Sequence, residues 1–288
     1  MNTAVKNTKK QNVLKVVGVI AAILVVYIAY DFFFYVSTDN AQIQANTVIL
    51  TARVSGFVTK VNVDEGQKVK AGDVLVEIDA KDYQSRATQS LNEVASVQAR
   101  AHDAGMNYQR IQKLFEQGAV SLQQRDSAQA TYQELSRKQK ALEAQEDVSK
   151  NSLVDTQLRA PSDGVIAKRS AEVGMLANAG TPLFGFVSSE SRWVIANFKE
   201  TDLSRLKVGQ KVKISVDAIS GRTYQGELEN FYPSTGSIFS LLPPDNATGN
   251  FTKVVQRVPA RIKLQDLSKD DIDLLKAGLS VVVDVKVH

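Results

Sequence analysis

The sequence predicts a mainly β protein that carries one long α-helical hairpin, and three observations lead to this fold class. A pattern of thirty residues occurs twice, at 50–79 and at 158–187. The stretch between the two copies has the spacing of apolar residues that is typical of long helices. Residues 191–288 alternate strand-like apolar runs with polar turns, which is typical of a small β-barrel. The runs that predict strands are 193–198, 211–217, 258–264 and 279–287.

The two copies of the repeat align without a gap, at the constant offset that separates Leu50 from Leu158. Eight positions are identical, namely Leu50/Leu158, Ala52/Ala160, Gly56/Gly164, Lys60/Lys168, Gly66/Gly174, Ala71/Ala179, Gly72/Gly180 and Leu75/Leu183. Short β-branched runs stand between the glycines, so we expect strands and turns, with Gly66 and Gly72 either at positive φ or where the chain turns tightly. Each copy is too small to bury a core alone. Residues 48–80 and 158–188 should therefore pack together as one flattened β-barrel or sandwich of the lipoyl or biotinyl type.

The segment 81–157 is predicted to form an antiparallel helical hairpin. From Lys81 to Glu116 there is no proline and only one glycine, and apolar or small residues recur at spacings of three and four. Residues 117–120 break this pattern, and Ser121 is a suitable N-cap for a second helix that runs towards Leu158. Each arm should be about 55 Å long.

Polar residues weaken the predicted seam between the two helices. Gln139, Gln145 and Ser152 fall at or near positions where a tight coiled coil prefers leucine. The hairpin is then either a poorly packed spacer or an arm that lateral contacts in an oligomer stabilise.

A lipoyl or biotinyl carrier would present a modifiable lysine on the tight turn between its halves. Lys81 lies near that point, but residues 81–157 separate the two halves, so Lys81 is predicted instead to begin the first helix. No cofactor is therefore expected. A membrane-tethered carrier protein stays as an alternative.

The N-terminal region predicts a membrane anchor. Residues 13–36 are apolar apart from Lys15 and Asp31, which is near the length that crosses a bilayer core of about 30 Å. A cleaved signal peptide is the alternative, but its apolar core is shorter and is followed by small residues. Lysines gather before and at the start of the span, and the next basic residue is Arg53. The positive-inside rule then places residues 1–12 in the cytoplasm and 37–288 across the membrane.

The composition excludes most kinds of chemistry. The chain has no cysteine and two histidines, which removes thiolate chemistry and leaves almost nothing for a histidine-based metal site or triad. Its net charge of +4 is small and its basic residues are spread out, so nucleic-acid binding is not expected. No glycine-rich phosphate loop or nucleophile elbow is present. We expect no active site and no enzyme activity.

Several stretches outside the insert carry a resemblance to a known family. They are Thr38–Ala41, Val54–Val58, Trp193–Thr201, Val208–Val212 and Gly236–Pro259. Together with the split repeat behind one N-terminal span, they resemble the HlyD-type membrane fusion proteins, which are periplasmic adaptors of efflux and secretion systems. Within that family they are similar to the EmrA-like branch.

This resemblance implies a function and a set of partners. The chain would be the adaptor of a tripartite efflux pump, anchored in the bacterial inner membrane with most of its residues in the periplasm. It would link a major-facilitator (EmrB-like) transporter to a TolC-like outer-membrane channel, act as a trimer or hexamer, and serve the export of drugs or toxic small molecules. An adaptor of an ATP-driven type I peptide or protein exporter is the alternative within the same architecture.

Two groups of residues are candidate contact sites. Arg110, Leu114 and Ser121 stand in the R-x3-L-x6-S arrangement that similar adaptors place at the hairpin tip to dock on the outer channel. Their purely structural reading is a solvated cation, a seam residue and a helix cap. The second group is an apolar cluster beside two prolines, formed by Ile238, Phe239, Leu241 and Leu242. It would either plug the open end of the barrel or contact the inner-membrane transporter or a neighbouring copy.

The expected organisation divides the chain into seven parts. They are a cytoplasmic tail (1–12), a transmembrane helix (13–36), a linker with the first barrel strand (37–47), the first half-motif (48–80), the hairpin (81–157), the second half-motif (158–188) and the β-barrel (189–288). The hairpin is expected to be shorter than in the longer EmrA-like proteins, which bears on whether it reaches the outer channel. No additional membrane-proximal domain is expected after the barrel.

Overall fold

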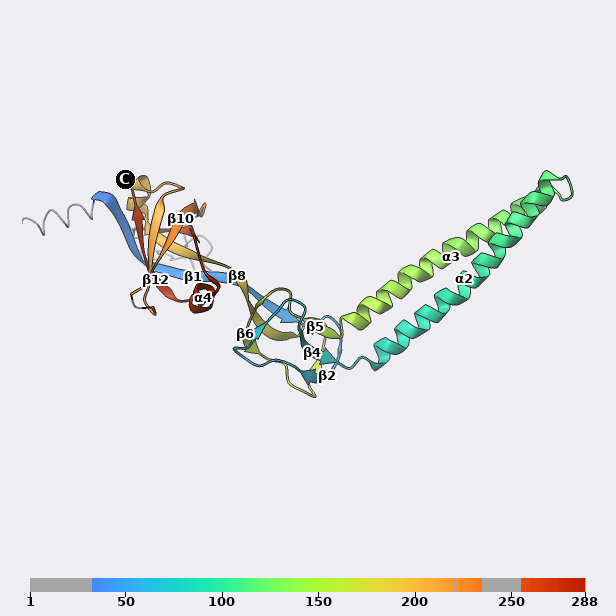
Figure 1. Cartoon of the computed structure of the whole chain (residues 1–288), viewed down its shortest axis with the longest axis horizontal. Helices are drawn as coiled ribbons and strands as arrows, with labels where there is room; N and C mark the ends of the chain where they lie inside the picture. The colour runs from blue at the N-terminus through green and yellow to red at the C-terminus, as the bar shows by residue number, and fades with distance from the viewer. Residues whose placement is uncertain (1–32, 220, 235–254, 288) are drawn as a thin grey trace, which may run out of the picture. The chain divides into compact units, whose positions relative to one another are not determined.

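The computed structural model describes residues 33–219, 221–234 and 255–287, which form two compact units (Figure 1). The barrel unit contains the described residues up to Asn46 and from Ser189 onward, and the sandwich unit is Thr47–Ser188. The chain passes between them within β1 (Tyr35–Thr51) and β8 (Pro182–Lys199). In the described ranges, no helix combines the length and the apolar character that a membrane crossing needs.

The barrel unit is a closed six-stranded sheet. Its strands follow the order β1, β12 (Ser280–Lys286), β9 (Lys211–Val216), β10 (Thr223–Phe231), β11 (Arg257–Leu264) and β8, and β1 also pairs with β8. The 3-10 helix η1 (Glu200–Arg205) follows β8, and α4 (Lys269–Leu274) precedes β12. Strands were predicted around β8, β9, β11 and β12. Strand β10 was not predicted.

The first barrel strand corrects the expected end of the membrane segment. Tyr35 and Val36 were assigned to the span 13–36, but they open β1, where Tyr35 pairs with Lys286 and Val36 with Val285. The Val36 side chain is buried in the barrel core. An apolar run that enters a barrel core cannot be distinguished by hydropathy from the end of a membrane span. The rest of the predicted span, 13–32, lies outside the described residues.

The sandwich unit contains the two copies of the repeat, and they occupy equivalent places. Its own strands are β2 (Gly56–Val61), β3 (Lys68–Val69), β4 (Val74–Ile78), β5 (Gln157–Arg159), β6 (Gly164–Arg169) and β7 (Leu176–Ala177). Strand β2 of the first copy pairs with β7 of the second, and Gly56 faces Ala177. The equivalent strand β6 of the second copy pairs with β3 of the first, and Gly164 faces Val69. A bulge interrupts β2 beside β4 and recurs in β6 beside β8. Gln157, expected in the hairpin, belongs to β5.

The turns that join these strands also repeat. Gly66 (φ 79°) adopts a positive φ, which was one of the two alternatives expected for it, and the equivalent Gly174 (φ 86°) does the same. The Gly66 N–H donates to the Ile166 carbonyl at 2.7 Å, and the Gly174 N–H donates to the equivalent Val58 carbonyl at 2.8 Å. Each turn therefore closes on a strand of the other copy. Because each half completes the backbone hydrogen bonding of the other, neither can form its sheet alone.

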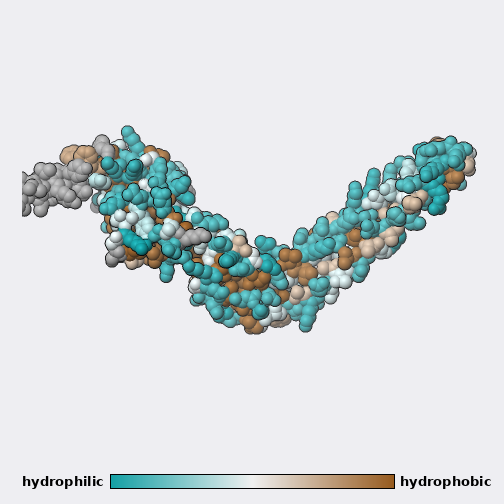
Figure 2. Space-filling view, viewed as in Figure 1, coloured by the Kyte–Doolittle hydropathy of each residue, from teal (hydrophilic) through white to brown (hydrophobic). Residues whose placement is uncertain are grey.

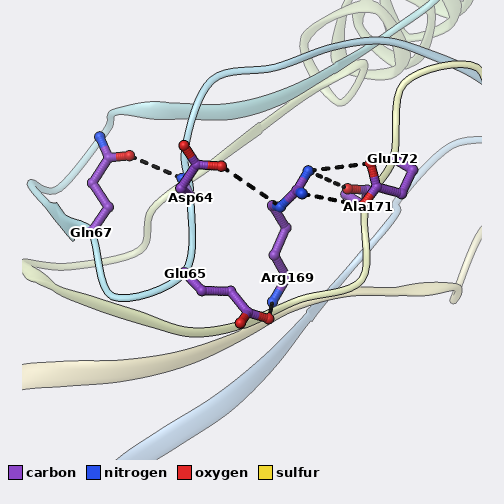
Figure 3. A network of polar contacts seen from close by, with 6 residues as sticks. All are labelled: Asp64, Glu65, Gln67, Arg169, Ala171 and Glu172. Carbon is purple, nitrogen blue, oxygen red and sulfur yellow. Dashed lines mark hydrogen bonds and ion pairs between the residues drawn. The ribbon is translucent and has the colours of Figure 1, made fainter.

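One polar network breaks this internal symmetry (Figure 3). The Arg169 guanidinium reaches Glu172 at 3.2 Å and the Ala171 carbonyl at 3.2 Å, and it lies 3.8 Å from Asp64. The Arg169 backbone N–H donates to the Glu65 carboxylate at 2.8 Å. The position equivalent to Arg169 in the first copy is Val61, so the network occurs on one side of the sandwich only.

Adding a methyl group at Gly164 should destabilise the sandwich unit. A Cβ there would contact the Phe186 ring and lie 2.5 Å from the Val187 carbonyl oxygen, which cannot move without shifting β8. We expect Gly164→Ala to cost about 1–3 kcal/mol of unfolding free energy, measured by denaturant titration. At the equivalent Gly56 the closest atom is a side-chain methyl of Ile78, at 2.6 Å. Gly56→Ala should therefore cost less, and an equal cost would contradict this account.

The hairpin consists of α2 (Lys81–Glu116) and α3 (Leu122–Val154), which confirms the predicted helices and the break between them. At 36 residues, α2 is about 54 Å long. The seam contains few apolar side chains, as expected. Polar and aromatic contacts supplement them: Ser90 hydrogen-bonds Ser149 at 3.0 Å, and the rings of Tyr108 and Tyr132 stack with centroids 6.1 Å apart.

Candidate docking site at the tip of the hairpin

The end of α2 is fixed by a glycine-based cap. Gly118 has a φ of 73°, a conformation that residues with a side chain rarely adopt. Its N–H donates to the Phe115 carbonyl, and the Ala119 N–H donates to the Leu114 carbonyl, both at 2.9 Å. This pair of bonds is a Schellman motif, which satisfies the last carbonyls of the helix and turns the chain sharply. The backbone of Leu114 is therefore part of the turn.

The start of α3 is fixed by a capping box. The Ser121 hydroxyl accepts a bond from the Gln124 backbone N–H at 3.3 Å, and the Gln124 side chain accepts one from the Ser121 N–H at 2.9 Å. These two bonds satisfy backbone groups that the helix leaves without a partner. Ser121 is thus a helix cap, as its structural reading predicted.

Arg110 and Leu114 lie one turn apart on the same face of α2. Arg110 is exposed, and among the described residues no side chain or carbonyl pairs with its guanidinium. Leu114 is half-buried. The neighbouring Phe115 is less available to a partner, because the Arg125 guanidinium lies over its ring, 5.2 Å from the ring centroid. This face of α2 therefore presents an unpaired arginine and a half-buried leucine, and the exposed Lys113 and the 53% exposed Leu122 lie beside them at the tip.

A shallow groove of about 800 Å³ runs between α2 and α3 next to the tip. Small and polar side chains line it: Ala104, Asn107 and Ile111 from α2, and Ser121, Gln123, Gln124, Ser127, Ala128 and Thr131 from the start of α3. Ser121 is the one member of the predicted triad in this lining. Figure 2 shows that the surface of the hairpin is mainly hydrophilic here. Sequence reasoning missed the groove, although its residues recur at spacings of three and four.

Replacing Ser121 tests whether its side chain caps α3. We expect Ser121→Ala to destabilise the first turn of α3 by about 1 kcal/mol, because the hydroxyl that accepts the Gln124 N–H is lost. Faster hydrogen exchange at residues 122–126 would report this loss. Aspartate caps helices as well as serine does. Ser121→Asp should therefore leave exchange unchanged, and fraying in both variants would contradict the cap assignment.

The second predicted group cannot be placed in the same way. Ile238, Phe239, Leu241 and Leu242 lie outside the described residues. The carrier alternative also lacks support, because Lys81 is the first residue of α2 and not part of a tight hairpin turn. Across the described ranges, no group of three or more His, Cys, Asp or Glu side chains is arranged to hold a metal ion.

A sandwich split by a helical hairpin and followed by a small barrel defines a class of adaptor proteins. Residues 46–189 match the model of the barrel-sandwich hybrid domain of RND MFP proteins, where MFP stands for membrane fusion protein. Residues 191–237 match the model of the CusB-like β-barrel domain. The chain therefore belongs to the membrane fusion protein family, whose members are adaptors and not enzymes.

Within this family the chain is of the EmrA type. It is 32% identical to the colistin resistance protein EmrA of Acinetobacter baumannii, over 96% of this chain and 95% of that protein. It is 35% identical to the fatty acid resistance protein FarA of Neisseria gonorrhoeae, over 86% of this chain and 75% of that protein. Its fold is similar to that of the membrane fusion protein Spr0693 from Streptococcus pneumoniae R6, with 19% identity and a TM-score of 0.62 over 88% and 99% of the two chains.

Proposed function

We propose that this protein is the periplasmic adaptor of an EmrA-like efflux pump. The observation that carries the proposal is the combination of two features: a sandwich in which each half of the repeat completes the sheet of the other, and a hairpin whose end presents the exposed Arg110 beside the half-buried Leu114. Such a chain is suited to hold two other proteins at a fixed separation. It supplies no energy for transport, and its phenotype depends on surfaces and not on a catalytic pocket.

The hairpin tip is the proposed docking surface for a TolC-like outer-membrane channel. Leu114 is only half-buried, so a partner that covers it would gain free energy from removing apolar area from water. Arg110 has no partner among the described residues, so an acceptor on the channel could pair with it without breaking an existing ion pair. Arginines and large apolar side chains that become buried together commonly dominate the energy of an interface.

The cap geometry supports this role by making the tip rigid. The Schellman motif at Gly118 and the capping box at Ser121 fix the turn from both sides. A rigid surface loses less conformational entropy when it docks than a flexible loop does. Ser121 then contributes mainly by positioning the turn, and Arg110 and Leu114 provide the contact.

The other proposed partners follow from the family. The predicted span within residues 13–32 would anchor the chain in the inner membrane, beside a major-facilitator (EmrB-like) transporter, with the described residues in the periplasm. The chain would act as a trimer or hexamer. Two relatives are named for resistance to colistin and to fatty acids, both amphipathic compounds, so amphipathic toxic molecules are the proposed cargo.

Complementation of a deletion strain tests the proposed function. Cells that lack this gene should accumulate an amphipathic dye or antibiotic, and the full chain should restore export only when the transporter gene is also present. The control is a strain that lacks the transporter alone, which should have the same defect. Normal export in the deletion strain, or rescue without the transporter, would contradict the proposal.

A further inference from the structure

We propose that one end of the barrel unit rests on the lipid surface of the membrane and binds anionic phospholipid headgroups. This end, called here the basic end, consists of residues 33–35, 199–211, 227–234, 255–257 and 286–287. The strand register brings these segments together, because Tyr35 pairs with Lys286 and Lys199 pairs with Arg257, while β9 begins at Lys211. In Figure 1 the start of β1 and the C-terminal end of β12 lie at the same end of the barrel.

Charge distinguishes the basic end from the rest of the barrel unit. It has six basic residues (Lys199, Arg205, Lys207, Lys211, Arg257 and Lys286) and four acidic ones (Glu200, Asp202, Glu227 and Glu229). At the opposite end, acidic residues outnumber basic ones. This end consists of residues 189–193, 217–219, 221–223 and 265–279. Its six acidic residues are Glu190, Asp217, Asp266, Asp270, Asp271 and Asp273, against the four basic residues Arg192, Arg222, Lys269 and Lys276. The barrel unit is therefore polarised along its strands.

Exposed apolar side chains are concentrated at the same end. Phe33 is 65% exposed, Val208 62%, Val255 51% and Tyr232 42%. In the described part of the barrel unit, only Leu274 at the opposite end is a comparably exposed large apolar residue. Soluble surfaces carry such residues singly, whereas a cluster of aromatic and aliphatic side chains among lysines is typical of a membrane interface.

The path of the chain identifies the membrane as the occupant of this surface. The 32 residues that precede Phe33 include the predicted span, and they join the barrel at the basic end. The first described residues are held to the barrel, since Arg205 donates to the Phe33 carbonyl at 2.9 Å and the Val287 N–H donates to the Phe34 carbonyl at 2.9 Å. A barrel tied to the end of a span must present this end to the headgroups. The inference rests on the proposed anchor.

Electrostatics and apolar burial would then act together. Each Lys or Arg near an anionic bilayer surface contributes attraction that decays over a Debye length of about 8 Å at physiological salt. Val208 lies between Lys207 and the turn that leads to Lys211, so its side chain would enter the interface where the cations meet the headgroups. Neutralising one of these lysines should weaken surface contact about fivefold.

Fluorescence quenching by lipid tests the inference. The chain has no cysteine, so Val208→Cys and Ala218→Cys each give a single labelling site, at the basic end and at the opposite end respectively. Both positions are exposed, so the label is accessible in each variant. The full chain is reconstituted without a transporter in vesicles of phosphatidylethanolamine and brominated phosphatidylglycerol. We expect strong quenching at position 208 and little at position 218. The double change Lys207→Gln and Lys211→Gln, or high salt, should reduce quenching at 208.

Three results would overturn the inference in distinguishable ways. Vesicle-bound protein with equal or absent quenching at both positions would refute the lipid contact and leave the anchor intact. Quenching at 208 that is lost when the transporter is added would assign the surface to that protein in the assembled pump. Failure of the full chain to sediment with vesicles would refute the lipid contact and the proposed anchor together.

Discussion

Excising the hairpin should leave the sandwich unit folded and abolish export. None of the buried residues that form the core of this unit lies between 79 and 155. The last register pair of β4 and β5 is Glu77 and Gln157, and one step beyond it the Ile78 N–H donates to the Thr156 carbonyl at 2.8 Å, so these two residues already lie side by side. Replacing residues 79–155 with Asn-Gly would join them by a two-residue turn of a type that hairpins favour. The loss of Arg53–Asp155 and Tyr83–Ser55 contacts involves exposed groups and should cost little.

Circular dichroism, denaturant unfolding and an export assay check this prediction. The helical signal should fall sharply, a cooperative unfolding transition should remain, and export should drop to the level of the deletion strain. An unfolded product would mean that the hairpin helps to form the sandwich. Retained export would show that the hairpin tip makes no essential contact.

Charge substitution at the tip should also abolish export, without removing the hairpin. Arg110→Asp reverses an exposed cation, and Leu114→Asp places a carboxylate where a partner would cover an apolar side chain. Disrupting a buried contact of this kind costs about 2–5 kcal/mol of binding free energy, which exceeds a tenfold loss of affinity. Expression and oligomer formation should be unchanged, because neither side chain lies in the core of either unit.

Matched variants distinguish a tip effect from general damage to the helices. Arg137 is an exposed arginine on α3, and Leu91 is a 50% exposed leucine on α2, both several turns from the tip. Arg137→Asp and Leu91→Asp should export normally. If these controls fail as completely as the tip variants do, charge anywhere on the hairpin is the cause. If Arg110→Asp and Leu114→Asp both export normally, the tip is not the docking site.

The repeat made the sandwich unit largely predictable from the sequence. Identical residues at one offset fall on equivalent turns, so a shared conformation of Gly66 and Gly174 followed from the alignment. The Arg169 network could not be predicted, since its position corresponds to Val61 and the contacts join side chains from both copies. Strand β10 was not predicted because Gly226 occupies one of its inward-facing positions. An apolar side chain at that position would have indicated a strand. Gly226 has no room for a Cβ, which would lie 2.9 Å from Ile262.

The candidate site was predictable only in part. The helix break at 117–120 placed Arg110, Leu114 and Ser121 near the tip, because glycine and a capping serine are strong local signals. The groove beside them depends on how α2 and α3 pack, and the weak seam gives little information on that packing. The charge difference between the two ends of the barrel unit could not be predicted either. The basic residues of one end come from separate segments of the sequence, and only the strand register brings them together.

Crosslinking from the hairpin tip in intact cells shows which protein the tip contacts. A photoreactive residue replaces Leu114, and a control carries it at Val148, an exposed position on α3 away from the tip. We expect position 114 to capture an outer-membrane channel protein and position 148 not to capture it. Capture of only other copies of this chain from position 114 would contradict the docking assignment, and with it the proposed export route.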